Sequence, residues 1–338
     1  MHQDEFAELA AIYEAELRAH CYRMLGSVHD AEDALQEALV RAWKGIDRFE
    51  GRGSVRSWLY SIATRTALDN ARHRSRREFA VDMGAPAGPG TELGAPLTEL
   101  PWLEPYPDQW LGSGGPPSPE ARYEQRESIE LAFVAAVQHL PPLQRAVLLL
   151  REVAGFSAAE TASLLGTTVP SVTSALQRAR VLVRKRLPAQ SQQATLRALG
   201  DRRTRELARQ YADAMERGDI QALVGMLTRE VTWSMPPVPT WFRGLAPVRD
   251  FLVRYPLTDQ WKHRPAGVSG QLAVAGYVYD EDRGGFIPAG IDVLTLDKDK
   301  IAAVTGFLTA DLIGPENAGT WVSGAELFGR FGLPAEAP

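Results

Sequence analysis

Cysteine is nearly absent from this sequence, and other features that would mark common classes of protein are missing too. The 338 residues contain one cysteine, Cys21, which excludes an internal disulfide and a cysteine-rich zinc site. No apolar run reaches the roughly 18 residues of a membrane span, and the N-terminal residues do not resemble a secretory signal. The six histidines are scattered without ligand spacing, so neither a metal nor a cofactor is expected. We expect a cytoplasmic protein without membrane association.

The net charge of −5 hides a strong segregation of charge along the chain. Positions 52–77 hold seven arginines against one acidic residue, Asp69. Positions 79–121 hold no Lys or Arg but six acidic residues, nine prolines and seven glycines. A basic segment can bind a polyanion whatever the overall charge, because the local potential governs such binding. The acidic segment has the composition of a linker and is not expected to form a core.

Two tryptophans and a tyrosine stand close together inside this linker: Trp102, Tyr106 and Trp110. An exposed aromatic cluster promotes aggregation, so we expect the stretch 100–111 to dock on another part of the protein. The alternative is a cluster that stays exposed to solvent.

The segment 157–186 has the pattern of two short helices joined by a tight turn. Ser157 and Glu160 form the Ser-x-x-Glu start of a capping box, and Gly166 stands where the turn needs a positive φ. A threonine at 167 or 168 can cap the second helix, and a proline lies in its first turn.

One face of this second helix is predicted to be buried and the other to be polar. Val169, Val172 and Leu176 recur at intervals of three and four and predict a buried stripe. The polar face and its basic tail comprise Thr173, Ser174, Gln177, Arg178, Arg180, Arg184, Lys185 and Arg186. Such a helix suits the major groove of DNA, with polar side chains on base edges and charges on phosphates. The plainer alternative is a helical hairpin within a larger bundle.

Residues 4–77 have a helical pattern with one break at 26–27. The segment 30–43 is predicted to bury Ala34, Leu35 and Trp43 on one side and to carry a polar face on the other. The segment 55–72 combines core residues with arginines beside aromatics, which suits single-stranded nucleic acid, since bases stack on rings and phosphates bind cations.

After position 200 the pattern changes from helix to strand. Helices are predicted at 202–217 and 220–227, and strands at 231–235, 272–279, 291–296 and 301–308, with a hairpin turn at 297–300. Helices followed by a curved antiparallel sheet indicate an α+β domain with a cavity. Its candidate catalytic groups are Asp250, His263 and Asp292, for which we favour surface or structural roles. Its candidate cavity or core aromatics are Trp233, Trp241, Tyr255 and Trp261.

Four segments together resemble a known family. They are Asp-Ala-Glu-Asp-Ala-Leu-Gln-Glu at 30–37, Ser-Trp-Leu-Tyr-Ser-Ile-Ala at 57–63, Leu-Pro-Pro-Leu-Gln-Arg-Ala-Val at 140–147, and the two-helix segment. In this order and spacing they resemble a bacterial sigma factor of the extracytoplasmic-function group. The C-terminal third resembles a SnoaL-like domain, the cone-shaped fold of polyketide cyclases and ketosteroid isomerases. The stretch 102–105 resembles the linker motif of sigma factors that carry this domain.

The resemblance implies a multidomain protein with two all-α sigma domains, a helical bundle and a helix-turn-helix, followed by an α+β SnoaL-like domain. The implied boundaries are 1–78 for region 2, 79–121 for the linker, 122–188 for region 4 and 200–335 for the SnoaL-like domain. The implied function is to bind the RNA polymerase core, at its clamp helices and flap, and to direct it to promoter DNA. We expect no enzymatic activity, and we expect the C-terminal domain to regulate the sigma modules in cis.

The resemblance also assigns roles to individual residues. Those implied to bind polymerase are Asp33, Gln36, Glu37 and Arg41. Those implied to recognise and melt the −10 element are Arg52, Arg56, Arg65, Asn70, Arg72 and Arg74. Those implied to bind the −35 element are Thr173, Ser174, Gln177, Arg178, Arg180 and Arg184. The expected interdomain contacts of the linker are Trp102, Leu103, Glu104, Pro105 and Trp110.

Two departures from the family pattern bear on DNA recognition. Arg65 stands where the family often has Asn, and Thr173 and Ala175 stand where it often has basic residues, which predicts fewer phosphate contacts. Two alternatives stay open. One is a helix-turn-helix repressor with a ligand-binding domain, against which the basic segment 52–77 argues. The other is a C-terminal domain that binds a small-molecule ligand or catalyses a reaction.

Overall fold

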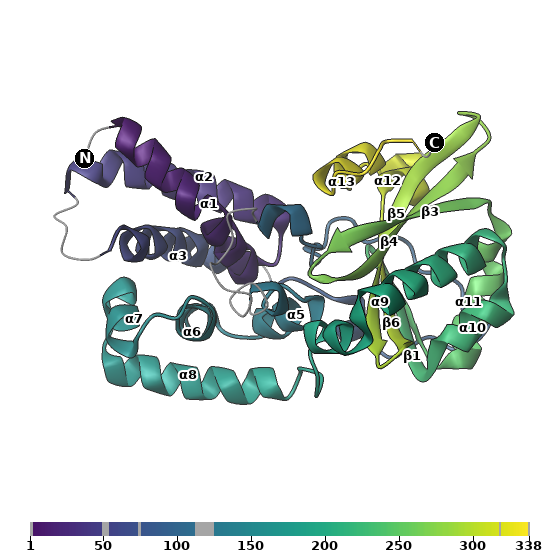
Figure 1. Cartoon of the computed structure of the whole chain (residues 1–338), viewed down its shortest axis with the longest axis horizontal. Helices are drawn as coiled ribbons and strands as arrows, with labels where there is room; N and C mark the ends of the chain where they lie inside the picture. Colours follow the sequence, from purple (N-terminus) through teal and green to yellow (C-terminus); the bar gives the residue numbers. More distant parts are fainter. Residues whose placement is uncertain (1–2, 49–53, 74–75, 112–124, 318, 337–338) are drawn as a thin grey trace. The chain divides into compact units, whose positions relative to one another are not determined.

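The structure is a computed structural model that describes residues 3–48, 54–73, 76–111, 125–317 and 319–336 (Figure 1). The chain divides into two compact units. The first comprises Met1–Arg77, Leu103–Tyr106 and Trp110–Ala189, and the second comprises Glu78–Trp102, Pro107–Gln109 and Gln190–Pro338. None of the helices in the described ranges combines the length and hydropathy that a membrane span requires.

The first unit is helical, as expected (Figure 1). Its N-terminal helices are α1 (Gln3–Leu25), α2 (Val28–Gly45) and α3 (Val55–His73), with a short 3-10 turn η1 (Ile46–Arg48). Its later helices are α5 (Leu131–Gln138), α6 (Pro142–Leu148), the π-helical turn η4 (Leu149–Val153), α7 (Ala158–Leu165) and α8 (Val169–Arg184). Cys21 is fully buried in α1.

The turn between α7 and α8 follows the sequence prediction. Ser157 and Glu160 form a complete capping box, and Gly166 ends α7 in the left-handed conformation at φ 64°. The side chain of Thr168 caps α8. Val172 is buried, but Val169 is 43% exposed. The prediction that Val169 is buried was wrong, because apolar spacing does not reveal which turns of a helix its neighbours cover.

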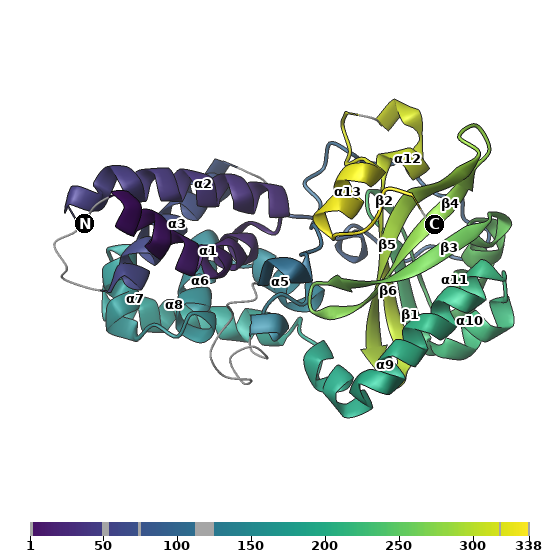
Figure 2. The same ribbon diagram turned by 45° about the horizontal axis from the view of Figure 1, so that its top comes forward.

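The second unit combines helices with one six-stranded sheet (Figure 2). The strands are β1 (Leu227–Met235), β2 (Val238–Arg243), β3 (Trp261–Val268), β4 (Gln271–Asp280), β5 (Gly285–Asp297) and β6 (Lys300–Leu308), in the order β2-β1-β6-β5-β4-β3. The helices are α9 (Gln192–Glu216), α10 (Ile220–Met226), α11 (Leu245–Arg254), α12 (Ala310–Ile313) and α13 (Gly324–Arg330). Short 3-10 turns are η2 (Ala80–Asp82), η3 (Asp108–Leu111, which runs from one unit into the other), η5 (Pro256–Thr258) and η6 (Pro315–Asn317).

Two features of the sheet differ from the prediction. β1 and β6 pair in parallel while the other neighbours pair antiparallel, so the sheet is mixed. β2 and β3 were missed as strands because each contains a proline, Pro239 or Pro265. Both strands lie at sheet edges, where a missing backbone N–H is tolerated. The predicted hairpin is confirmed, with Asp297 paired to Lys300.

The core of the second unit lies between the sheet and its helices. In Figure 2, α9 crosses the sheet, with α10 and α11 beyond it. Tyr211 of α9, Trp233 of β1 and Phe251 of α11 belong to one buried cluster. This packing brings aromatic side chains from three elements together in one core.

Candidate nucleic-acid interface and cavity

The predicted reading face of α8 is exposed in the structure. Thr173, Ser174, Gln177 and Arg178 are all exposed, and the Thr173 hydroxyl donates only within the helix, to the Val169 carbonyl at 3.0 Å. These side chains are therefore accessible to base edges in a major groove.

Ala175 does not lie on this reading face. It is 4% exposed and packs in the cluster formed by α5, α6 and α8. The inference that Ala175 replaces a basic contact to DNA was therefore wrong, because a basic side chain at this position would have to enter the core.

The basic tail of α8 contains two kinds of arginine. Arg180 Nε donates to Glu152 Oε1 at 2.5 Å, so part of its charge is neutralised. Arg184 is exposed, and within the described ranges it forms no ion pair. More of the charge of Arg184 than of Arg180 is therefore available to an anion such as a phosphate.

The arginines of α3 are engaged within the first unit. Arg56 pairs with Glu16 and donates to the Ala154 carbonyl at 2.9 Å, and its guanidinium lies 4.7 Å from the ring centre of Phe156. Hydrogen bonding to Glu16 and the charge of that carboxylate raise the pKa of Arg56 even though burial opposes this. Arg65, although exposed, donates to the Leu164 carbonyl at 3.3 Å.

Of the four remaining residues predicted to bind the −10 element, two lie in the described part of the chain. Asn70 is half-buried, and Arg72 is exposed and pairs with Asp69 at 3.3 Å. Arg52 and Arg74 lie outside the described residues.

The four residues predicted to bind polymerase form an exposed face of α2. Asp33, Gln36, Glu37 and Arg41 are all exposed, and Arg41 pairs with Glu37 at 2.5 Å. Trp43 is 45% exposed, so its predicted place in the core was wrong.

Val40, also on α2, is 51% exposed and was missed as a candidate. Positions 36, 40 and 43 share a helical face by their i, i+4, i+7 spacing, and this signal could have found the apolar part of the surface.

Part of the linker motif caps α2. The Glu104 carboxylate accepts hydrogen bonds from Ser27 Oγ at 2.7 Å and from the Val28 backbone N–H at 2.9 Å. The Tyr22 hydroxyl donates to the Glu104 carbonyl at 2.7 Å. A carboxylate at a helix N-terminus satisfies free N–H groups and interacts favourably with the helix dipole.

Three further linker residues belong to the first unit. Leu103 and Pro105 are buried. The rings of Trp110 and Tyr106 meet edge to face, and the guanidinium of Arg18 lies 5.3 Å from the centre of the Trp110 ring.

The linker residue before Leu103 lies in the core of the second unit. Trp102 is 1% exposed and packs with Ala80 and Trp241, and its indole N–H donates to the Leu97 carbonyl at 2.8 Å. The Trp241 indole donates to the Gly84 carbonyl at 3.1 Å. The expectation that this segment contributes to no core was therefore wrong, because its few aromatic side chains pack against the folded units.

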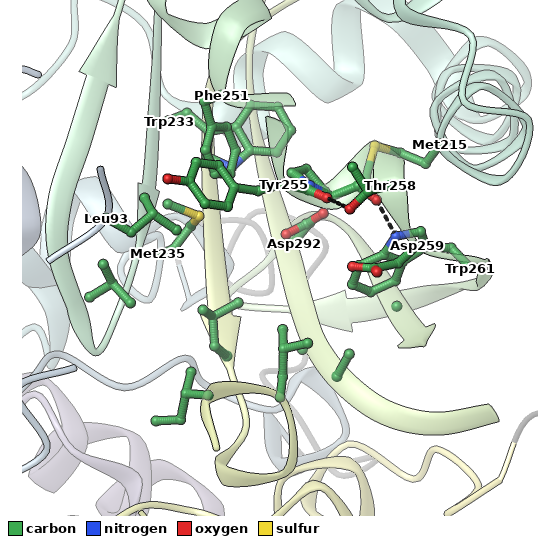
Figure 3. A pocket seen from close by; sticks show the side chains of 18 of the residues that line it. Leu93, Met215, Trp233, Met235, Phe251, Tyr255, Thr258, Asp259, Trp261 and Asp292 are labelled. Atoms are coloured by element: carbon green, nitrogen blue, oxygen red, sulfur yellow. Dashed lines mark hydrogen bonds between the residues drawn. The ribbon is translucent and has the colours of Figure 1, made fainter. Parts of the chain in front are cut away.

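A cavity of about 410 Å³ opens within the second unit. Figure 3 shows its aromatic and apolar side chains around the Asp292 carboxyl group. Its lining includes Trp233, Phe251, Tyr255 and Trp261, but not Trp241. The linker supplies part of the wall through Leu93, Gly94 and Pro96.

Two of the three candidate acid–base residues line this cavity. The Tyr211 hydroxyl donates to Asp292 Oδ2 at 2.7 Å, and burial raises the pKa of Asp292 to about 6. Burial lowers the pKa of His263 to about 4, so its imidazole is neutral near pH 7 and its 3.7 Å approach to Glu216 is not an ion pair. Asp250 instead accepts from the Gly90 backbone at 2.7 Å, outside the cavity lining. Among described residues, no three metal-ligating side chains are grouped to hold an ion.

Known proteins resemble this chain along its whole length. The family models for Sigma-70 region 2, Sigma-70 region 4 and the SnoaL-like domain match residues 9–77, 130–183 and 208–304. ECF RNA polymerase sigma factor SigG of Mycobacterium tuberculosis (strain ATCC 25618 / H37Rv) is 38% identical over 98% of this chain and 84% of that protein. SigW of Bacillus subtilis (strain 168) is 32% identical over 55% of this chain and 90% of that protein.

A solved structure shares the fold. The crystal structure of Mycobacterium tuberculosis extracytoplasmic function sigma factor SigJ matches with a TM-score of 0.56 at 21% identity, over 91% of this chain and 99% of that chain. The predicted fold class, helical sigma domains followed by an α+β SnoaL-like domain, is confirmed. The chain belongs to the extracytoplasmic-function (ECF) RNA polymerase sigma factors, and its function is promoter-directed initiation of transcription.

Proposed function

We propose that the C-terminal unit regulates the sigma modules in cis through the linker, and that the DNA and polymerase contacts fall on the faces predicted from the sequence. In this proposal α8 binds the −35 element through its exposed polar face. α3 binds the −10 element through Arg56, Arg65, Asn70 and Arg72. The exposed face of α2 binds the clamp helices of polymerase core, with Val40 and Trp43 adding apolar contact area, and region 4 binds the flap. Acting with polymerase on promoter DNA places the protein in the cytoplasm.

The observation that carries the regulatory proposal is the way the linker is anchored. Trp102 is held in a cluster of the second unit, whereas Leu103 to Tyr106 belong to the first. A rearrangement that moves Trp102 therefore acts directly, through the peptide chain, on the Glu104 cap of α2. Since α2 carries the proposed polymerase surface, this connection gives the C-terminal unit a route to sigma activity.

The engagement of the α3 arginines supports the same proposal. Arg56 and Arg65 donate to the carbonyls of Ala154 and Leu164, which lie in the helix-turn-helix part of the first unit. Binding of the −10 element by α3 requires these bonds to be exchanged for contacts with DNA. The C-terminal unit can regulate the protein by favouring or opposing this exchange of hydrogen bonds for DNA contacts.

The experiment compares Glu104→Gln with truncation after Leu187. Both changes remove an anchor of the linker, and we expect both to change run-off transcription in the same direction, measured with core enzyme on a melted-bubble template. Loss of the charged cap costs about 1–2 kcal/mol, which corresponds to an effect of about fivefold to thirtyfold.

The matched control is Glu99→Gln, because Glu99 is an exposed linker carboxylate whose loss removes the same charge. This variant should behave as the full chain. If truncation and Glu104→Gln both leave core binding and transcription unchanged, the regulatory proposal fails.

We further propose that the C-terminal unit senses a small molecule and does not catalyse a reaction. The neutral state of His263 and the bond from Tyr211 to Asp292 are compatible with a binding role. Turnover of a ketone substrate by the full chain would contradict this part of the proposal.

A further inference from the structure

We propose that the cavity of the second unit binds an amphiphilic organic amine, a cation carried on an apolar or aromatic body. The assignment rests on the proposed sensing role of this unit and adds the chemical class of the ligand. It follows from three features of the lining: its apolar walls, the carboxyl group of Asp292, and the aromatic rings beside that group.

The walls set the size and polarity of the ligand. A volume of about 410 Å³ suits a drug-sized organic molecule, since such sites span about 300–1,000 Å³. Leu93, Met235, Leu308 and Ile313 contribute apolar surface to the walls. Burying a sugar or a nucleotide against this surface would leave most of its polar groups without hydrogen bonds. The body of the ligand is therefore hydrophobic.

The carboxyl groups in the lining favour a ligand that carries a positive charge. Asp292 and Asp259 both line the cavity, and in the part of the chain that the structure describes neither forms an ion pair, but Asp259 is exposed to solvent, so the preference for a cation rests on Asp292. Arg254, the one arginine in the lining, is engaged with Asp250 at 3.5 Å and with the Thr91 carbonyl at 3.2 Å. A carboxylate in an apolar cavity gains strongly from a cation, because the surroundings do not screen the attraction.

The position of Asp292 makes it the anchor for this charge. It retains accessible surface although protein surrounds it, and Figure 3 shows its carboxyl group in the middle of the lining, between Tyr255 and Trp261. Its pKa of about 6 leaves it ionised in neutral solution. Tyr211 supplies one hydrogen bond, so the carboxylate keeps acceptor capacity for an ammonium group.

The aromatic rings add to the preference for a cation. Trp233 and Trp261 line the same space, and a ring face attracts a cation by about 0.5–2 kcal/mol, whereas the Tyr255 ring already carries the guanidinium of Arg254 at 5.2 Å. His263 does not oppose a cation, because burial lowers the pKa of its imidazole to about 4 and keeps it neutral. A neutral ligand would use the same walls but would leave the Asp292 carboxylate without a counter-charge.

The linker is part of this site. Leu93, Gly94 and Pro96 line the cavity, and the segment is held to the domain by bonds from Gly94 N–H to Thr240 Oγ1 at 2.8 Å and from Leu97 N–H to the Pro237 carbonyl at 2.9 Å. A ligand that packs against this wall stabilises the seated linker. Binding of a ligand in the cavity can therefore be detected by a measurement on the linker itself.

The test uses the full chain and matched pairs of probes, tryptamine with indole-3-ethanol and imipramine with iminodibenzyl. Each pair shares a ring system, and only the first member carries a cationic amine at pH 7.5. Isothermal titration is expected to show each amine binding at least about tenfold more tightly than its neutral partner, a difference of about 1.4 kcal/mol. Hydrogen exchange at 84–97 is expected to slow with the amines.

Asp292→Asn should remove the preference for the amine while leaving affinity for the neutral partner. Asp282→Asn, at an exposed turn, removes the same charge and should keep the preference. Equal or tighter binding of the neutral probes to the unmodified chain would overturn the proposal without relying on any variant, as would the absence of amine binding up to about 1 mM. Because polymerase is absent from this assay, its failure leaves the transcription test of cis regulation independent.

Discussion

Arg145 in the first unit and Asp292 in the second are both ionisable groups surrounded by protein, yet they are satisfied to different degrees. Arg145 donates to the carbonyls of Met24, Gln138 and Leu140 and to Gln138 Oε1, the last at 2.6 Å. Among the described residues, Asp292 accepts one side-chain hydrogen bond, from Tyr211. Burial lowers the pKa of Arg145 only to about 10, so it stays charged, whereas it raises the pKa of Asp292 into the physiological range.

The difference separates a structural role from a binding role. Arg145 joins the end of α1 to the α5–α6 connection, and its terminal nitrogens are fully used for that purpose. Asp292 keeps unused acceptor capacity toward a cavity, where a ligand can supply what the protein does not. A buried charge alone does not identify a functional site. The number of its hydrogen-bond partners distinguishes a structural role from a binding role.

The largest expected effect is on Arg145, whose two terminal nitrogens each donate two hydrogen bonds. Arg145→Met leaves several buried carbonyl groups without donors, each costing about 1–3 kcal/mol, so we expect the first unit to lose about 3–5 kcal/mol of stability. Urea-dependent hydrogen exchange of peptides from α5 and α6 measures this loss separately from the second unit.

The control is Arg126→Met, because Arg126 is exposed and the same change there should cost little. Equal protection from hydrogen exchange in α5 and α6 of both variants would show that Arg145 does not hold these helices in place.

The next effect concerns the pH dependence contributed by Asp292. Its pKa rises from the ordinary 3.8 to about 6 on folding, so the folded state binds the proton more tightly. The stability it contributes is complete below pH 3.8 and is lost as the pH rises through 6, an effect of about 3 kcal/mol. Asp292→Asn should therefore gain about 2–3 kcal/mol relative to the unmodified chain between pH 4 and pH 7.

His263 acts with the opposite sign. Its pKa falls from 6.5 to about 4 on folding, so its contribution is present above pH 6.5 and is lost as the pH falls through 4. The two groups offset each other in the unmodified chain, and His263→Gln should lose stability relative to it as the pH rises. Chemical denaturation across this range measures both differences. A pH-independent difference for either variant would contradict the assigned pKa.

The helix-turn-helix could be predicted from the sequence because its signals are local. The capping box at Ser157, the glycine turn at Gly166 and the apolar spacing after it depend on neighbours a few residues away. The prediction for Trp43 failed because a helical repeat does not reveal which face another helix covers. The engagement of Arg56 with Phe156 could not be predicted either, since it joins segments a hundred residues apart.

The cavity was predictable only in outline. The change from helical to strand period indicated a concave α+β domain, and Asp292 was named among several candidates without a motif to rank it. Its partner Tyr211 lies on a helix 81 residues away, and the linker wall at Leu93 comes from a segment whose composition indicated no packing at all. The spacing of residues in the sequence does not reveal such long-range contacts. Ranking Asp292 above the other candidate residues therefore required the three-dimensional fold.

The smallest expected effect applies the same comparison to the basic tail of α8. Arg180 is bonded to Glu152, whereas Arg184 forms no ion pair within the described residues. Neutralising one phosphate contact changes the slope of log affinity against log salt by about 0.9. Arg184→Ala should lower the slope by about this amount, and Arg180→Ala by less, because Glu152 already offsets that charge. Fluorescence anisotropy with labelled duplex DNA between about 50 and 200 mM salt measures both slopes, with Gln177→Ala as the uncharged control. Equal losses for the two arginines would mean that Arg180 leaves Glu152 when DNA binds, and that a partner seen in the free chain does not predict the role of a surface charge.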